Sequence, residues 1–367
     1  MARMPRKFVV DEDEVGVYHC INRCVRRAFL CGTDEVSGKC FDHRKQFIQD
    51  RLELLAGVFG IDVLAFAVMS NHLHVVLRNR PDVVKSWSDD EVARRWWNLF
   101  PTRRDDSGEP ADPRSSDLSM IGSDPEKLAE IRRRLSNIGW LMRCVAEPVA
   151  RMANREDECT GRFWEGRYKC QPLLDEAAVA ACMAYVDLNP IRAGIAKTPE
   201  SSQFTSAFER LKGAKDEGLR SSNEATAPTK LKSQRTRRGS WLSPVELALD
   251  HAAESEVLPR RRASNRGCLS MSEQDYLKLL DWSGRQLRHG KRGTIPAALP
   301  PIMARLGMSG DGWMTLMKDF GRLFHRAAGN PESLAREASR RKLKSLHGIR
   351  KSRAAFSPQA NKSIHTL

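Results

Sequence analysis

The N-terminal part of the chain switches between stretches whose apolar residues alternate and stretches where they recur at helical spacing. Val15–Val25 alternates and contains β-branched and aromatic residues, which predicts a first strand. Phe41–Gly60 has apolar residues at helical spacing and predicts a helix that ends at the glycine. The apolar run Ile61–Met69 predicts a second strand. Ser70-Asn71 then forms a tight turn that leads into a third strand, His72–Leu77.

Residues 81–123 interrupt this regular pattern. They contain one short candidate helix, Ser88–Leu99, followed by the polar stretch Arg103–Ser116, and we interpret them as an insertion at a surface loop. The following segment, from Asp124 to about Arg155, predicts one long helix with an apolar stripe. Gly161–Lys169 is strand-like and rich in aromatic residues and arginine.

Asp175 can cap a further helix, Glu176–Leu188, which stops at Asn189-Pro190. The predicted order is therefore β-α-β-β-α-β-α. This order favours an α+β fold, in which an antiparallel or mixed sheet carries helices on one face, as in the ferredoxin-like motif.

The sequence predicts four regions: a first domain over 8–200 with its insertion at about 81–123, a basic linker over 201–240, a mainly α-helical accessory domain over 241–330 and a basic tail over 331–367. The linker is rich in Ser, Lys and Thr and ends in the basic run Lys232–Arg238. The accessory region contains these candidate helices: Trp241–His251, Met271–Leu280, Pro300–Leu306 and Trp313–Arg326. They lack the spacing of a helix-turn-helix, so a DNA-binding role and a role in oligomerisation both remain open.

The net charge of the chain indicates a class of binding partner. The 367 residues include 61 Lys and Arg against 46 Asp and Glu, a formal net charge of +15. Such an excess points to a polyanion, nucleic acid first and an anionic membrane second, although a basic protein without such a partner stays an alternative. No apolar run is long enough to span a membrane, and no apolar segment follows the basic N-terminus as in a signal peptide.

Nine cysteines, an odd number, favour free thiols and a cytoplasmic protein. Cys20, Cys24, Cys31 and Cys40 cluster early in the chain, but they lack the paired C-x-x-C spacing of a structural zinc site.

Two histidines separated by one residue are the strongest chemical signal. His72 and His74 start the third predicted strand, and successive strand side chains point to opposite faces, so both imidazoles project from the same side. Such a pair can form half of a divalent-metal site. The alternative is a pair of ordinary half-buried strand histidines.

Tyr185 and Asn189 lie four residues apart, at or near the end of the helix predicted over 176–188, and therefore share one of its faces. A tyrosine hydroxyl can attack phosphorus and form a covalent phosphotyrosine, and a metal beside it would stabilise the developing charge. Asn189 can supply an oxygen ligand to that metal. Of the four tyrosines (Tyr18, Tyr168, Tyr185 and Tyr276), only Tyr185 has such a neighbour. The alternative is a core tyrosine followed by an asparagine C-cap.

Three motifs occur in a consistent order: Met-Ser-Asn-His-Leu-His at 69–74, Gly-Arg-Phe-Trp-Glu-Gly-Arg-Tyr-Lys at 161–169 and Tyr-Val-Asp-Leu-Asn-Pro-Ile-Arg-Ala-Gly at 185–194. Over about residues 8–200, the chain resembles the one-tyrosine HUH transposases, most closely the REP-associated tyrosine transposases. The resemblance implies a ferredoxin-like HUH domain, Mg²⁺ or Mn²⁺ dependence and a substrate of single-stranded or hairpin DNA. It also implies nicking through a 5′-phosphotyrosine with a free 3′-hydroxyl, followed by rejoining.

By position, the resemblance makes His72 and His74 metal ligands, Tyr185 the nucleophile and Asn189 the third ligand. The chain departs from the family at Ser70, where proline is usual, and at Cys24, where glycine is usual. Two alternatives stay open: an HUH nickase of replication, and a catalytically silent, domesticated transposase that regulates through DNA binding. The sequence also leaves open whether two copies pair as a homodimer.

Basic side chains near these motifs are candidate DNA contacts, although each can equally be a solvated surface charge: Arg23, Arg26, Arg27, Arg162, Arg167 and Lys169. Two aromatic residues of the Gly161–Lys169 segment are candidates for stacking on a base. We expect Tyr168 to be suited to this role, whereas for Trp164 a buried indole is the favoured alternative.

Overall fold

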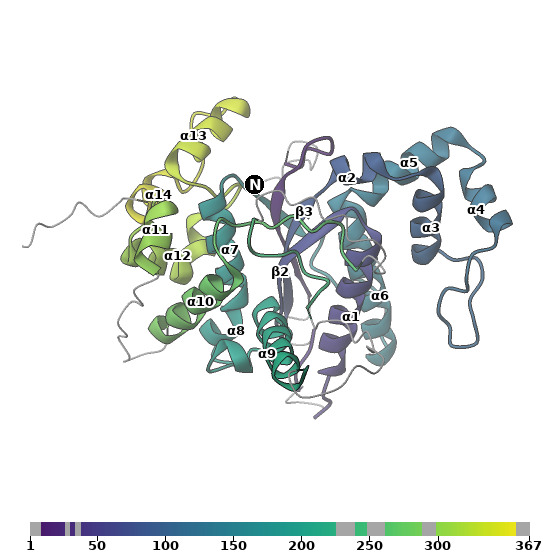
Figure 1. The fold of residues 1–367 in the computed structure, drawn as a ribbon, viewed down its shortest axis with the longest axis horizontal. Coiled ribbons are helices and arrows are strands. Elements are labelled where there is room, and N and C mark those ends of the chain that lie inside the picture. Colours follow the sequence, from purple (N-terminus) through teal and green to yellow (C-terminus); the bar gives the residue numbers. More distant parts are fainter. Residues whose placement is uncertain are drawn as a thin grey trace, which may run out of the picture.

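A four-stranded antiparallel sheet forms the centre of the protein, in the order β2-β3-β1-β4 (Figure 1). The structure is a computed structural model that describes residues 9–25, 30–33, 38–224, 239–247, 261–287 and 299–356. The strands are β1 (Val17–Arg23), β2 (Ile61–Val68), β3 (His72–Asn79) and β4 (Lys169–Leu173). With its many helices, the protein is of the α+β class, as predicted.

The turn at Ser70-Asn71 forms as predicted and sets the register of the central hairpin. The amide of Met69 donates to the carbonyl of His72, and Val68 pairs with Leu73 across β2 and β3. β1 then pairs with the other edge of β3, with Ile21 opposite His74. β4 starts only at Lys169, so the segment predicted as strand-like over 161–169 is largely irregular.

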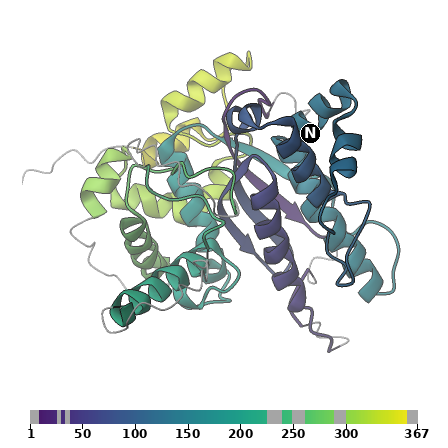
Figure 2. The same cartoon turned by 45° about the vertical axis from the view of Figure 1, so that its right-hand side comes forward.

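Helices cover both faces of the sheet, so the prediction of helices on one face only is wrong (Figure 2). Helices α1 (His43–Val58) and α6 (Ile138–Glu156) share one hydrophobic cluster with Leu73, Val75 and Leu77 of β3. Helix α7 (Glu176–Asp187) shares another with the opposite face, including Val76. All residues of β2 are buried, and an apolar strand with two buried faces needs cover on both sides.

Helix α7 is buried almost all round, because the C-terminal helices pack on it from outside. Five of its twelve residues are alanine, which allows close packing, and Asp175 caps it by accepting from the amide of Ala178. The outer helices are α10 (Glu273–Leu287), α11 (Leu299–Arg305) and α12 (Gly310–Leu323). They belong to the same hydrophobic cluster as α7, so they extend the first domain instead of forming a separate accessory core.

The basic tail also contains structure, in helices α13 (Pro331–Arg340) and α14 (Ile349–Ala355). The predicted linker is partly wrong as well, because helix α9 (Ser206–Glu224) lies within it. Lys232–Arg238 lies outside the described residues. The described part of the predicted helix Trp241–His251 is not helical, and its Glu246 forms a parallel bridge with Leu269 instead. Two short turns, α8 (Asn189–Arg192) and the 3-10 helix η2 (Pro199–Ser201), follow α7.

The insertion is helical, with α2 (Pro81–Ser86), α3 (Asp89–Leu99) and α4 (Ser115–Gly122). The long helix predicted from Asp124 is two helices, α5 (Pro125–Leu135) and α6, separated at Ser136-Asn137. Asn137 interrupts the apolar stripe because its side chain caps α6 by accepting from the amide of Trp140. In the part of the chain that the structure describes, no helix combines the length and apolarity needed to cross a membrane.

Candidate metal and nucleic-acid site

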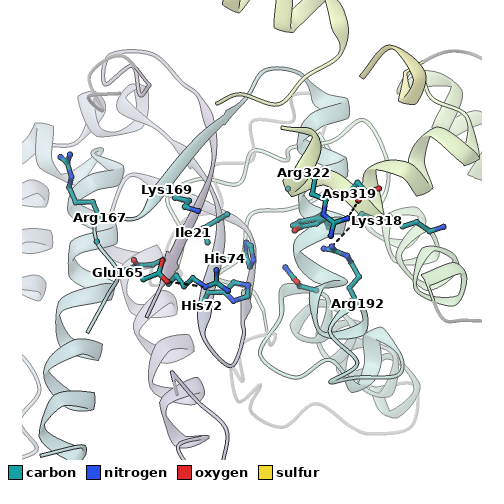
Figure 3. Close-up of a pocket in the computed structure, with 16 residues that line it drawn as sticks. Ile21, His72, His74, Glu165, Arg167, Lys169, Arg192, Lys318, Asp319 and Arg322 are labelled. Atoms are coloured by element: carbon teal, nitrogen blue, oxygen red, sulfur yellow. Dashed lines mark hydrogen bonds and ion pairs between the residues drawn. The ribbon is translucent and has the colours of Figure 1, made fainter. Parts of the chain in front are cut away.

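A cavity of about 530 Å³ opens where the end of β1, the start of β3 and helices α7, α8 and α12 converge (Figure 3). It brings together residues from distant parts of the sequence. Its lining includes both histidines, Tyr185, Asn189 and several basic side chains. Because α12 forms one wall, the C-terminal region contributes directly to this site.

The two histidines project into the cavity from β3 with their ring centroids 4.6 Å apart. Nδ1 of His74 lies 2.8 Å from Nε2 of His19, a residue of β1 that the sequence analysis did not single out. Nδ1 of His72 bonds to Oδ1 of Asn71, which is an acceptor, so this ring nitrogen carries the proton. That bond leaves Nε2 of His72 unprotonated and able to bind a metal. If Nδ1 of His74 carries the proton of that ring, Nε2 of His74 is unprotonated and able to bind a metal as well.

Burial keeps this histidine cluster neutral. It lowers the pKa of His19 and of His72 to about 4 and the pKa of His74 well below its usual value. Neighbouring positive charges act in the same direction on His72 and His74. A histidine binds a metal only through a neutral imidazole, and burial favours this protonation state at physiological pH.

Tyr185 extends from α7 towards the same cavity. Its ring lies edge-on to His74, with centroids 6.1 Å apart and an interplanar angle of 84°. The guanidinium carbon of Arg192 lies 4.2 Å from the centroid of the Tyr185 ring, and Phe320 of α12 packs against it at 5.3 Å. The phenol is therefore held between α8 and α12, although its side chain is only partly buried.

Two buried nitrogens at the cavity have no hydrogen-bond partner, and both belong to the turn after α7. They are Nδ2 of Asn189 and Nη1 of Arg192. Buried polar atoms without a protein partner are rare in folded proteins and need a partner such as water, an ion or a ligand. Asn189 begins α8 instead of capping α7, whose C-cap is Leu188, so the C-cap alternative is wrong.

The cavity lining contains donor atoms of the types that a divalent cation accepts. Two imidazole nitrogens and an amide oxygen are ligands that Mn²⁺ accepts, and phosphate oxygens or water would complete the coordination. No group of three His, Cys, Asp or Glu side chains within the described residues has metal-binding geometry, so a third protein ligand would have to be an amide or hydroxyl oxygen. Asn189 lines the cavity and is a suitable residue for this.

The candidate DNA contacts separate into three groups. Arg23, Arg167 and Lys169 line the cavity, as do the additional basic residues Arg192, Lys318 and Arg322. Arg162 is exposed and does not line it, so it falls outside the site. Arg26 and Arg27 lie outside the described residues.

The candidate stacking residues of this segment are buried. Tyr168 is only 8% exposed, so the expectation that it is placed to stack on a base is wrong. Trp164 is equally buried and donates from Nε1 to the carbonyl of Ala146 at 2.8 Å, as the alternative of a buried indole predicted.

Comparison with solved structures gives a match of low similarity. Among solved structures, the chain is similar to a REP-associated tyrosine transposase bound to a REP hairpin. The identity is 11%, the TM-score is 0.29, and the match covers 64% of this chain and 94% of that one. The sequence matches no protein-family model and no curated protein. Because a TM-score this low does not establish a shared fold, any functional conclusion depends on the site residues.

Sequence reasoning missed His19, Arg192 and the whole contribution of α12. A signal existed for the first, because His19 lies two residues before Ile21 in the predicted strand and therefore on the same face; in the structure Ile21 pairs with His74. Arg192 follows Asn189 by three residues and therefore shares its side of the turn. The sequence offered no signal for α12, because its approach to Tyr185 depends on the packing of α10 and α12 onto α7.

Proposed function

We propose that the protein is a DNA transposase that nicks and rejoins single-stranded DNA through Tyr185, with Mg²⁺ or Mn²⁺ held by His72, His74 and Asn189. One observation carries this proposal: a candidate nucleophile, three candidate ligands and several basic side chains, drawn from separate elements, line a single cavity. A site that cleaves a phosphodiester needs these groups close together. A pair of histidines with a purely structural role does not need them.

The strand order supports a ferredoxin-like HUH domain. β1, α1 and β2 form a βαβ unit into which β3 inserts antiparallel, as in the split βαβ arrangement of that motif. The three sequence motifs that resemble those of the HUH transposases lie around this sheet. Met69–His74 contains the β2–β3 turn, Gly161–Lys169 leads into β4, and Tyr185–Gly194 spans the end of α7 and the turn after it.

The residues divide the chemistry between them. The hydroxyl oxygen of Tyr185 attacks the phosphorus, and the bond from the phosphorus to the 3′-oxygen breaks. The upstream fragment leaves with a free 3′-hydroxyl, which takes up the proton released by the tyrosine, while the 5′-phosphate of the downstream fragment stays bonded to Tyr185. A bound Mg²⁺ or Mn²⁺ would polarise the phosphate and stabilise the leaving oxygen. Arg192 can donate its unpartnered Nη1 to a phosphate oxygen beside the Tyr185 ring. Rejoining is the reverse attack by a 3′-hydroxyl on the phosphotyrosine.

An adduct assay tests the proposal. Protein is incubated with Mn²⁺ and labelled single strands that contain a hairpin, and a denaturation-resistant protein–DNA adduct is measured. We expect an adduct for the wild type that maps to Tyr185 by mass spectrometry, and none for Tyr185→Phe. Tyr18→Phe, which removes a hydroxyl bonded to the Asp11 amide and away from the cavity, is the matched control and should retain the adduct.

Changing His72 to Ala should abolish the adduct and leave most DNA affinity, because affinity depends mainly on neutralised phosphates. His43→Ala, which removes a histidine bonded to Glu156, is the control. An adduct that persists in Tyr185→Phe would refute the nucleophile assignment. DNA binding without any adduct in the wild type would support the alternative of a catalytically silent regulator.

A further inference from the structure

A second surface combines aromatic and basic side chains, and it lies on the insertion and α6, away from Tyr185. Trp96 and Phe100 of the α3 segment meet Trp140 of α6. The ring centroids are 4.7 Å apart for Trp96 and Phe100 and 5.8 Å for Trp96 and Trp140. Phe100 is 46% exposed, a large exposed fraction for a phenylalanine. Figure 1 shows α3 and α6 on the side of the sheet away from α7.

Arginines stack on these rings. The guanidinium carbon of Arg134 lies 4.4 Å from the centroid of a Trp140 ring and 5.7 Å from that of a Trp96 ring. The guanidinium carbon of Arg143 lies 5.2 Å from the centroid of a Trp140 ring. Both arginines also pair with a glutamate on their own helix, but such partly exposed pairs contribute little and can open to let a phosphate in.

An adjoining cavity of about 940 Å³ continues this surface between α1, α3 and α6. Its floor includes apolar residues such as Leu54 and Phe100, and Leu54 is 37% exposed. Five arginines line it, Arg51, Arg104, Arg143, Arg151 and Arg155, against three acidic residues, Asp50, Glu109 and Glu147. Among these residues the basic side chains exceed the acidic ones, so the lining of the cavity carries an excess of positive charge.

We propose that this surface binds a stretch of single-stranded DNA, with a base stacked on the exposed Phe100, beside Trp140, and phosphates held by the arginines along the cavity. The ligand class rests on the proposed function, and the surface favours a single strand over a duplex. Aromatic faces bind unstacked bases, which a duplex does not present, and arginines between them neutralise the backbone. Because it lies beyond α6, the surface would bind DNA flanking the strand at Tyr185.

Binding of a fluorescein-labelled 30-nucleotide oligothymidine, measured by anisotropy in EDTA, tests the inference without any cleavage. The variant Phe100→Ala with Arg155→Ala removes one stacking platform and one rim charge, both at exposed positions. We expect its Kd to rise at least tenfold, since one stacked base alone is worth about 1–3 kcal/mol. The matched control is Met120→Ala with Arg94→Ala, which removes an exposed apolar side chain and an exposed arginine from the same insertion, outside the cavity.

A second readout locates the strand directly. Oligothymidine with 5-iododeoxyuridine at each third position is photo-cross-linked, and the labelled peptides are identified by mass spectrometry. Cross-links to the peptides that contain Phe100 or Trp140 support the inference. Cross-links confined to residues of the Tyr185 cavity would overturn it, as would equal affinities of the two double variants or equal competition by a duplex of the same length.

The outcome is separable from that of the proposed function. The adduct at Tyr185 is measured with a short hairpin substrate, whose cleavage should be unchanged in the Phe100→Ala, Arg155→Ala variant. If the DNA-binding tests of this surface fail while the Tyr185 adduct still forms, only the second site is refuted. A missing adduct with retained cross-links refutes only the catalytic proposal.

Discussion

Nε2 of His19 lies 2.8 Å from Nδ1 of His74, and the two rings are stacked with an interplanar angle of 16°. His19 also bonds to Gln171 of the neighbouring strand β4. If Nδ1 of His74 donates to His19 and His19 donates to Gln171, these hydrogen bonds connect three strands. Nε2 of His74 would then be unprotonated. His19 would thereby orient a proposed ligand without contacting the metal itself.

Replacing His19 by Phe should weaken metal binding by removing this support. The ring volume is kept, but Nδ1 of His74 loses its partner, and loss of such a partner typically costs 10–100-fold in metal affinity. Titration with Mn²⁺ followed by electron paramagnetic resonance measures the effect, with His43→Ala as the control. An unchanged Mn²⁺ affinity in His19→Phe would show that the contact does not orient a ligand.

The stability of the metal-free protein should fall as the solution is acidified from about pH 6.5 to pH 5. Burial lowers the pKa of His19 and His72 from 6.5 to about 4, so the unfolded chain takes up these protons before the folded chain does. Unfolding is then favoured by about 1.4 kcal/mol per pH unit for each such histidine within this window. Urea unfolding in EDTA measures it, and His72→Gln should make the dependence shallower.

Arg192 should matter for cleavage more than for DNA affinity. Its guanidinium covers the Tyr185 ring at 4.2 Å, Nη2 donates to the carbonyl of Lys318, and Nη1 is buried without a partner. We expect Arg192→Gln to slow adduct formation 10–100-fold, and Arg192→Lys not to restore it, because an ammonium cannot stack flat on the ring while donating at both ends.

The control for Arg192 is Arg322→Gln, whose side chain lines the same cavity but is 88% exposed. The two variants are compared by the rate of adduct formation and by the Kd for a single strand in EDTA. Equal rates in Arg192→Gln and Arg322→Gln would mean that the stacked position of Arg192 has no role in the reaction.

Gly321 leaves space for the tyrosine hydroxyl. A Cβ at this position would lie 3.1 Å from the Tyr185 oxygen, closer than most such contacts. Gly321→Ala should therefore slow adduct formation several-fold, while thermal stability stays constant or rises, since alanine favours a helix by about 1 kcal/mol over glycine. Gly122→Ala in α4, where a Cβ meets nothing within 4 Å, is the control. A full-rate Gly321→Ala enzyme would contradict this steric role.

Tyr276 connects the C-terminal region to helix α7 through a buried hydrogen bond. Its hydroxyl donates to Oδ2 of Asp187 at 2.7 Å, and the amide of Ala207 and the hydroxyl of Ser206 donate to Oδ1. Tyr276→Phe should lower the free energy of unfolding by about 1–3 kcal/mol, because it leaves the buried carboxylate with one donor fewer. Urea unfolding of Tyr276→Phe beside Tyr18→Phe tests this, and equal losses would contradict a special contribution of the Asp187 network.

The sequence by itself determined the local elements around the site. The alternation of β1, the hairpin turn at Ser70-Asn71 and the helix that ends near Tyr185 all depend on neighbouring residues, and the structure has each of them. The placement of His72 and His74 on one face follows in the same way from the period of a strand. Errors arose where a local signal had two interpretations, as at Ser136-Asn137, where Ser136 is the C-cap of α5 and Asn137 the N-cap of α6.

Only the tertiary structure decided which distant groups share the site. His19 reaches His74 because β1 pairs with β3, and Tyr185 faces both because α7 packs across the sheet. The same packing covers the second face of the sheet and brings α12 against the Tyr185 ring. Residues predicted to form a separate domain therefore line the cavity. Periodicity fixes the face on which a side chain lies, whereas contacts between elements depend on the burial of apolar surface summed over the whole chain.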